Sequence, residues 1–275
     1  MSFLNNVYVS DCVDFMKKIK KDSIDMILTS PPYDDLRDYK GYNFNFENTA
    51  KEMYRILKDG GIAVWIVGDK TENGDESGTS FKQALRFKEI GFKLHDTMIY
   101  QKDSSQYPRK DAYLSTFEYM FILSKKGVNT FNPMVKRGKY YTSSPKSITT
   151  RQKDGITTAK IVKLNPEVII GNVWRITSGY LKTTKDKYAY EHPAMFPEEL
   201  AEMHIRSWSN INDVVFDPFC GSGTTCKMAK ILNRQFLGCD ISDDYIKIAK
   251  KRIDSAIVRV DDYGFEGIDA WEVDE

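Results

Sequence analysis

The run Ile24-Asp25-Met26-Ile27-Leu28-Thr29-Ser30-Pro31-Pro32-Tyr33 joins an apolar segment to a rigid polar corner. Its apolar half predicts a buried strand over residues 24–28. The two prolines fix φ and remove two backbone donors, so the carbonyl oxygens of Ser30 and Pro31 stay free to accept hydrogen bonds. A hydroxyl, free carbonyls and an aromatic ring suit a planar base that carries an amino group. A strand that simply ends at a Pro-Pro turn with a packing tyrosine would have the same sequence.

A second strand and turn lie near the other end of the chain, in Val214-Val215-Phe216-Asp217-Pro218-Phe219-Cys220-Gly221-Ser222-Gly223-Thr224-Thr225. An apolar strand is followed there by an acidic residue, a Gly-x-Gly turn and a helix that begins near Thr224. The glycines allow positive φ and a close approach of a ligand to the backbone. Because the Asp217 carboxylate would repel a phosphate and could hold an ammonium group, the turn argues against a pyrophosphate ligand.

Acidic residues also follow two further predicted strands. Asp240 ends the strand Gln235–Cys239, close to the spacing at which a carboxylate accepts hydrogen bonds from ribose hydroxyls. With the glycine turn it predicts a nucleoside that carries an amino acid, and S-adenosylmethionine is the obvious candidate. Asp11 follows the strand predicted over 6–9. The alternative for Asp240 and Asp11 is a helix N-cap without contact to a ligand.

The order of the predicted elements indicates an α/β fold. Apolar strands at 24–28 and 62–67 alternate with helices at 47–57 and 80–90, and Asp59-Gly60-Gly61 is expected to end the first helix. Two consecutive strands, 93–101 and 117–124, predict a hairpin. A helix is predicted over 198–208 with Pro197 at its start, and another over 243–253. We expect a doubly wound, mostly parallel sheet with helices on both faces.

The segment from Lys125 to Tyr190 is strongly basic. It contains 14 Lys and Arg residues against three Asp and Glu residues, so it carries +11, whereas the whole chain carries only +1. A basic segment on an acidic body is expected where a protein contacts a polyanion at one face. Most charge runs are solvated loops, but these basic residues alternate with aromatic and hydroxyl residues, which favours nucleic acid. We interpret 127–190 as a separate insert of short strands and loops.

The composition excludes several other classes of protein. Hydrophobic residues make up 41% and charged residues 29% of the chain, as in ordinary globular proteins. No apolar run approaches the ~20 residues of a membrane span, and residues 1–6 do not resemble a signal peptide. The four cysteines form no CxxC pair and the three histidines are scattered, so we expect neither a metal site nor disulfides. The expected location is a reducing cytoplasm.

Together, the two motifs and the basic insert between them resemble the amino-methylating DNA methyltransferases of the permuted motif order called the β class. The resemblance covers about residues 6–258 and is specific, because two independent motifs occur in the right order. It implies the Rossmann-like fold of S-adenosylmethionine-dependent methyltransferases and double-stranded DNA as the partner. It also implies a catalytic and cofactor-binding domain over 1–126 and 191–260, a target-recognition insert over 127–190 and an acidic tail over 261–275.

The resemblance further implies roles for individual residues. The catalytic residues, which hold the target amine, would be Ser30, Pro31, Pro32 and Tyr33. The cofactor-binding residues would be Asp11 near the adenine, Asp240 at the ribose and, in the glycine turn, Asp217, Phe219, Gly221, Gly223 and Thr224. Around the methionine end of the cofactor, the family has a segment that resembles Pro197 and Glu198 together with His192, Pro193 and Phe196.

The target base is less defined than the reaction. Many adenine-methylating members have Asp or Asn where this chain has Ser30, and serine is more typical of cytosine-N4 enzymes, although it also occurs in adenine-N6 enzymes. Cytosine N4 is therefore the first hypothesis and adenine N6 the second. The cysteines do not stand in the Pro-Cys context that ring-carbon methylation requires. We therefore expect direct transfer to the amine of a base flipped out of the duplex.

Other functions are compatible with parts of the sequence. An RNA or protein methyltransferase on the same scaffold would keep both motifs, and a non-catalytic DNA-binding protein would explain the basic insert. A nicotinamide dehydrogenase fits least, because Asp217 has the wrong charge for its pyrophosphate. A cognate restriction enzyme, as in a restriction-modification system, and a homodimer are both compatible with the resemblance, and the sequence decides neither.

Overall fold

The computed structural model describes residues 3–32, 44–103, 113–138, 141, 144–192 and 194–259. Tyr33 and Pro193, which both have predicted roles, lie outside these residues, as does the tail 261–275. The chain divides into two compact units. Unit 1 comprises Met1–Asn132 and Asn172–Asp262, and unit 2 comprises Pro133–Gly171 and Tyr263–Glu275.

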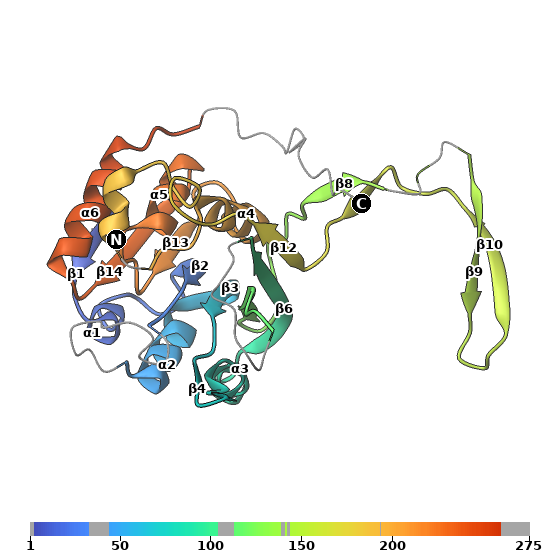
Figure 1. Cartoon of the computed structure of the whole chain (residues 1–275), viewed down its shortest axis with the longest axis horizontal. Helices are drawn as coiled ribbons and strands as arrows, with labels where there is room; N and C mark the ends of the chain where they lie inside the picture. Colours follow the sequence, from blue (N-terminus) through green and yellow to red (C-terminus); the bar gives the residue numbers. More distant parts are fainter. Residues whose placement is uncertain are drawn as a thin grey trace. The chain divides into compact units, whose positions relative to one another are not determined.

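Unit 1 is built on an eight-stranded sheet with the strand order β1-β14-β13-β2-β3-β7-β6-β12 (Figure 1). Neighbouring strands are parallel, except that β7 is antiparallel to both β3 and β6. This arrangement confirms the mostly parallel α/β sheet and the predicted hairpin of 93–101 with 117–124. The strands are β1 (Asn6–Val9), β2 (Ile24–Thr29), β3 (Leu57–Val67), β6 (Lys93–Lys102), β7 (Phe117–Ser124), β12 (Val173–Ile176), β13 (Val214–Asp217) and β14 (Gln235–Asp240).

Helices cover the sheet in two layers (Figure 1). One layer contains α1 (Cys12–Met16), α2 (Phe46–Ile56) and α3 (Thr79–Ile90), with contacts from α1 to α2 and from α2 to α3. The other contains α4 (Glu198–Trp208), α5 (Thr224–Ile231) and α6 (Asp243–Ser255), joined by contacts from α4 to α5 and from α5 to α6. A 3-10 turn, η1 (Lys187–Glu191), contacts α6, and a small hairpin, β4 (Thr71–Glu72) with β5 (Asp75–Glu76), precedes α3.

The predicted helix stop at Asp59-Gly60-Gly61 is wrong. Helix α2 ends at Ile56, and Leu57 is already extended, so the two glycines lie inside β3. The strand starts early because the end of β7 supplies hydrogen-bond partners for it. The Gly60 N–H donates to the Lys125 carbonyl at 2.7 Å, and Lys125 Nζ donates to the Leu57 carbonyl at 2.7 Å. A long-range pairing of strands therefore overrides the local glycine signal.

The basic insert is shorter as a compact unit than the predicted 127–190. Residues from Asn172 onward belong to unit 1, because Val173–Ile176 pairs in parallel with Ile99–Lys102 at the edge of the sheet. Trp174 and Ile176 in this strand are buried, while Val173 and Arg175 are exposed. This alternation, which begins within the stretch predicted as a single apolar run over 167–174, is the period of a strand with one covered face.

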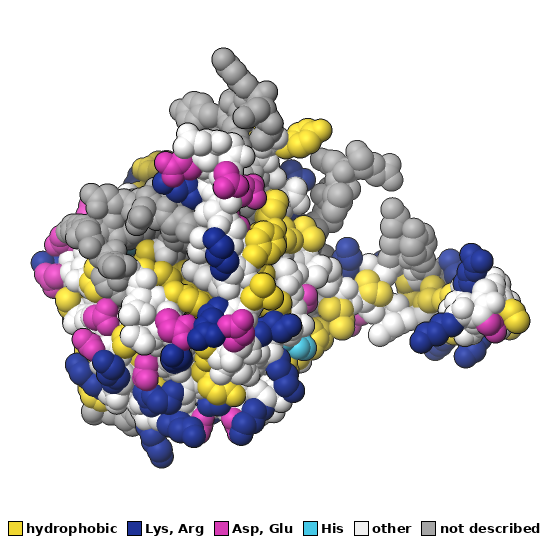
Figure 2. Space-filling view, turned by 90° about the horizontal axis from the view of Figure 1, so that it is seen from below, with side chains coloured by type: hydrophobic (Ala, Val, Ile, Leu, Met, Phe, Trp, Pro, Cys, Tyr) yellow, Lys and Arg dark blue, Asp and Glu magenta, His cyan; other side chains and the backbone are white. Residues whose placement is uncertain are grey.

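Unit 2 contains two antiparallel ribbons over residues 133–171. The ribbons pair β8 (Val135–Arg137) with β11 (Glu167–Ile169) and β9 (Lys146–Arg151) with β10 (Thr157–Val162). Almost every strand residue is exposed. Residues 133–171 contain eight Lys and Arg against two Asp and Glu, and Figure 2 shows basic side chains around the β9–β10 ribbon. The ribbons thus expose backbone, apolar and basic groups together.

In the part of the chain that the structure describes, every helix is too short or too polar to cross a membrane.

Candidate active site

Most of the strands of unit 1 end at the same edge of the sheet. Parallel strands bring their carboxyl ends together there, and the antiparallel β7 contributes its amino end. The residues that follow or precede these ends surround one cavity of about 1140 Å³. They include Ser10 after β1, Ser30 after β2, Asp69 after β3, Lys102 in β6, Glu118 in β7, Ser178 after β12, Phe219 after β13 and Asp240 in β14.

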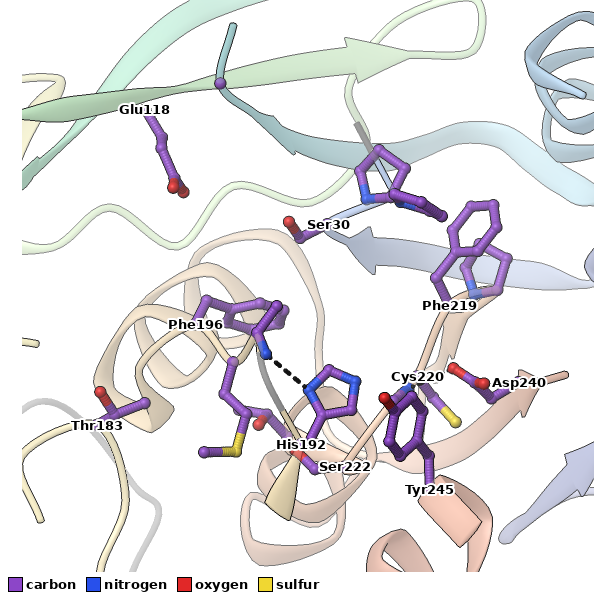
Figure 3. A pocket seen from close by; sticks show the side chains of 18 of the residues that line it. Ser30, Glu118, Thr183, His192, Phe196, Phe219, Cys220, Ser222, Asp240 and Tyr245 are labelled. Atoms are coloured by element: carbon purple, nitrogen blue, oxygen red, sulfur yellow. Dashed lines mark hydrogen bonds between the residues drawn. The ribbon is translucent and has the colours of Figure 1, made fainter. Parts of the chain in front are cut away.

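The cavity has two ends with different chemistry. Figure 3 shows Asp240 and Tyr245 on one side and Glu118 on the opposite side. Ser30 lies between them, with its hydroxyl turned toward the open space that Glu118 also faces. The first end is formed by the glycine turn and the second by the hairpin of β6 and β7. A ligand of the glycine turn and a second ligand near Glu118 would therefore both reach Ser30.

At the first end, the backbone holds the Asp240 carboxylate in place. The Gly221 N–H donates to Asp240 Oδ2 at 3.0 Å, and the Ser242 N–H donates to Oδ1 at 2.9 Å. Burial raises the pKa of Asp240 above its ordinary value. Each carboxylate oxygen has further lone pairs, so the group can still accept hydrogen bonds from hydroxyls of a ligand. Asp240 lies in the wall of the cavity, as a ribose-binding carboxylate requires.

His192 and Tyr245 pack beside the glycine turn. Their ring centroids are 4.3 Å apart, edge to face. The Ala194 N–H donates to His192 Nδ1 at 3.2 Å, so the proton of the neutral imidazole belongs on Nε2. A Cβ atom at Gly221 would lie 2.6 Å from that Nε2. The imidazole thus lies directly on the backbone of the turn, where only glycine leaves room for it.

Asp217 lies beneath the turn rather than in the wall of the cavity. Its side chain is buried, and its Oδ1 accepts hydrogen bonds from Thr29 Oγ1 at 2.6 Å and from the Phe219 N–H at 3.0 Å. These bonds join the strand that leads to Ser30 to the strand that leads to the glycine turn. Burial raises the pKa of Asp217 to about 6. Its predicted contact with an ammonium group stays a prediction.

The substitution Asp217→Asn is expected to reduce the dependence of stability on pH. A buried carboxyl with a raised pKa favours the protonated form in the folded state. The free energy of unfolding of the wild type should therefore fall as the pH rises from 3.8 through about 6, by about 3 kcal/mol from this group. Asparagine stays neutral and keeps the acceptor. Urea unfolding between pH 4 and pH 7 measures the slope, with Asp75→Asn as the exposed control. Equal slopes in wild type and Asp217→Asn would contradict this assignment.

A buried ionic cluster lies under the same turn. Arg252 is 0% exposed and donates to Asp186 at 2.9 Å and to Glu198 at 2.5 Å, and Lys227 donates to both carboxylates at 2.7 Å. Arg252 Nη1 also donates to the Ser222 carbonyl at 2.9 Å. Burial raises the pKa of Asp186, but the bonds from Lys227 and Arg252 outweigh this effect and lower it. The charges balance, and the cluster holds the backbone of the turn from below.

Comparisons with known proteins match this geometry. Residues 24–251 match the sequence model of a family described as DNA methylase, of the N6 and N4 type. The chain belongs to this family. The family resemblance drawn from the two motifs is thereby confirmed.

Two relatives and two solved structures illustrate the similarity of this methylase. The orphan methyltransferase M.BamHII of Bacillus amyloliquefaciens is 52% identical over 240 residues, which cover 86% of this chain and 91% of the relative. The DNA adenine methyltransferase YhdJ of Escherichia coli (strain K12) is 30% identical over 263 residues, covering 90% and 81%. The PvuII DNA methyltransferase, cytosine-N4-specific, has a TM-score of 0.64 at 21% identity, covering 90% of this chain and 85% of that chain. A DNA modification methylase of Thermus thermophilus, solved with S-adenosyl-L-methionine, has a TM-score of 0.62 at 24% identity, covering 90% and 92%.

The predicted site residues of the methylase fall into two groups. Those in the cavity wall are Ser30, Pro31, Pro32, Phe219, Gly221, Thr224 and Asp240. Those outside the wall are Asp11, Asp217, Gly223, Pro197 and Glu198. Asp11 caps α1 by accepting from the Val13 N–H at 2.8 Å, while its neighbours Ser10 and Cys12 line the cavity. Direct contact of the second group with a cofactor stays a prediction.

Sequence reasoning did not identify several residues of the methylase site. Lys102, Glu118 and Asp69 line the cavity, and Arg252 and Asp186 hold the glycine turn. Each lies at the end of a predicted element or in a segment without a motif. The available signal was their position at strand ends, which becomes informative only when the order of the strands is known.

Proposed function

We propose that this methylase transfers a methyl group from S-adenosylmethionine to the exocyclic amine of a base flipped out of duplex DNA, with cytosine N4 as the first target. The observation that carries the proposal is one shared cavity. Ser30 and the Pro-Pro corner line the same space as the glycine turn and Asp240. A nucleoside on Asp240 and a base at Ser30 would thus meet inside a single site.

The residues of the cavity fit S-adenosylmethionine. Asp240 offers acceptors for ribose hydroxyls, and the apolar side chains of Phe219 and Ile241 flank the same end of the wall for an adenine ring. Phe196 and Met195 line the side near His192, where the methionine portion would pack. When bound, the cofactor supplies an electrophilic methyl group on a sulfonium.

The chain's own groups position the base for direct transfer. Ser30 Oγ and the carbonyl of Ser30 or Pro31 would accept the two amine hydrogens, which draws the nitrogen lone pair out of conjugation with the ring and toward the methyl group. We assign the stacking of the base to Tyr33. A covalent enzyme intermediate is not required. Cys220 lines the cavity, but burial raises the pKa of its thiol well above the ordinary value, so it stays protonated and poorly nucleophilic.

Cytosine N4 is preferred because serine occupies the first catalytic position. Adenine N6 is the alternative, and the similarity to a DNA adenine methyltransferase supports it. The basic ribbons of unit 2 are proposed to bind the phosphate backbone and to recognise the target sequence. A cytoplasmic location fits this role. A cognate restriction enzyme and a homodimer belong to the proposal only as partners to be tested.

The test is incubation of the protein with unmethylated genomic DNA and labelled S-adenosylmethionine, followed by nucleoside digestion and mass spectrometry. N4-methylcytosine would establish the proposed target. N6-methyladenine would keep the reaction and replace the base. Label in RNA, or salt-dependent DNA binding without any transfer, would overturn the proposal. Sequencing of the modified DNA then identifies the recognition site for the experiments below.

The substitution Ser30→Ala is expected to lower kcat about 100-fold, because the amine loses the hydroxyl that orients it. Cofactor affinity, measured by calorimetry, should stay unchanged, since the glycine turn and Asp240 are intact. Ser10→Ala is the matched control: Ser10 also lines the cavity, but its hydroxyl donates to the Asp11 carbonyl. If Ser30→Ala and Ser10→Ala have equally small effects on kcat, Ser30 does not hold the amine.

A further inference from the structure

The end of the cavity opposite the glycine turn carries a largely buried pair of charges. Lys102 Nζ donates to Glu118 Oε1, and the two side chains are only 21% and 14% exposed. Both line the cavity. Ion pairs on a protein surface are mostly exposed and contribute little to stability, whereas these two charges are largely removed from water in a cavity.

The register of the hairpin explains why these side chains meet. Tyr100 in β6 lies opposite Glu118 in β7, and Lys102 follows Tyr100 by two residues, so all three point to the same face of the sheet. The Lys102 N–H donates to the Thr116 carbonyl at 2.7 Å, which fixes the backbone at this point. Lys102 Nζ is also 5.9 Å from the centre of the Tyr100 ring. The ammonium therefore has a defined place on the cavity wall.

The ammonium can serve a ligand as well as Glu118. It has three N–H donors, and the carboxylate accepts one of them. Glu118 keeps Lys102 charged and in place, and it balances the charge when the cavity is dry. Tyr100 adds no charge, because burial raises the pKa of its hydroxyl to about 12. This end of the cavity therefore presents hydrogen-bond donors that are held in place before a ligand arrives.

A flipped cytosine or adenine has a matching acceptor. In both bases the ring nitrogen beside the amino-bearing carbon, N3 of cytosine or N1 of adenine, accepts a hydrogen bond. Thymine and guanine carry N–H at the corresponding edge. With the amine at Ser30, the ring would extend into the space that Glu118 faces in Figure 3. A donor at this end thus favours the two bases that can be methylated on an amine.

We propose that Lys102 donates a hydrogen bond to the ring nitrogen next to the amino-bearing carbon of the target base, and that Glu118 is the positioning residue for Lys102. This inference rests on the proposed function and assigns a base-specificity residue to the same site. It holds for either target base, because the acceptor is common to both.

The test compares DNA duplexes that carry the normal base or its deaza analogue at the methylated position. The analogue, 3-deazacytosine or 1-deazaadenine, replaces the ring nitrogen by C–H and keeps the amine. The wild type is expected to methylate the normal base about ten- to 100-fold faster, as for loss of a hydrogen bond from a charged donor. In Lys102→Met the rate on the normal base should fall and the preference should fall to about one. Lys102→Arg, which keeps a charged donor, should retain part of the preference.

Two further variants separate recognition from stability. The double variant Lys102→Met with Glu118→Gln leaves no unpaired charge, and it should also show no preference. Glu118→Gln alone should reduce the preference without abolishing it, because Lys102 loses its fixed position but keeps its charge. If Lys102→Met and the double variant keep the preference of the wild type, or if the wild type shows none, the inference is wrong. Absence of methylation of any DNA by the wild type would instead overturn the proposed function.

Discussion

Replacement of Arg252 by methionine is expected to lower the free energy of unfolding by about 3–5 kcal/mol, the range found when one partner of a buried ion pair is removed. Arg252 is fully buried and donates to Asp186, Glu198, Ser222 and Thr224. In the variant, Lys227 would have to compensate two carboxylates alone. The Ser222 carbonyl would also lose its donor. Urea unfolding at pH 7 measures the loss.

The same variant should weaken binding of S-adenosylmethionine, because Arg252 holds the backbone of the glycine turn from below. Calorimetry on the folded variant measures this second effect. Lys247→Met on the same helix is the matched control. Lys247 pairs with Asp243 at 2.6 Å, but its side chain is 69% exposed, so its loss should cost less than about 1 kcal/mol. Similar losses in Arg252→Met and Lys247→Met would refute the cluster as a support of the site.

Replacement of Gly223 by alanine is expected to cost about 2–4 kcal/mol, from two separate causes. The residue has φ of +82°, which is strained for alanine by about 1–2 kcal/mol. A new Cβ would also lie 2.8 Å from the Cβ and 3.0 Å from the Cα of Ala249. Overpacking of this kind adds about 1–3 kcal/mol, because the backbone of α6 must move. Cofactor binding should weaken as well, since Gly223 leads directly into Thr224 in the cavity wall.

Gly74→Ala separates the two causes. Gly74 has φ of +80°, and a Cβ there would have nothing within 4 Å. This variant should lose only the backbone term of about 1–2 kcal/mol. Thermal and urea unfolding of both variants measure the difference. If Gly223→Ala is no less stable than Gly74→Ala, the packing of the turn against α6 is looser than the structure indicates.

Much of the site could be predicted because its motifs are local. The Pro-Pro corner after β2 and the Gly-x-Gly turn after β13 are short sequences whose backbone geometry depends on neighbouring residues. Asp240 could be predicted from its distance along the chain to the turn. The same local signals led to an error at Asp59-Gly60-Gly61, where the pairing of β3 with the end of β7 extends the strand through the glycines.

The remainder of the site depends on contacts between distant segments. Glu198 was predicted at the cofactor from its motif, but its Oε1 accepts from Arg252 and Lys227 beneath the turn. Lys102 and Glu118 are 16 residues apart and meet through the register of a hairpin. Burial and partners of a charged side chain follow from packing, and a single sequence does not contain them.

By itself, the sequence determined the α/β class, the DNA methylase family and the two strand ends at which the motifs of this protein stand. These features depend on periodicity and on the steric limits of glycine and proline, which act within a few residues. Only the tertiary structure decided which side chains share a cavity, which carboxylates are buried as ion pairs and where the basic ribbons begin. These features follow from the order and register of the strands, because that order brings residues far apart in the chain to one edge of the sheet.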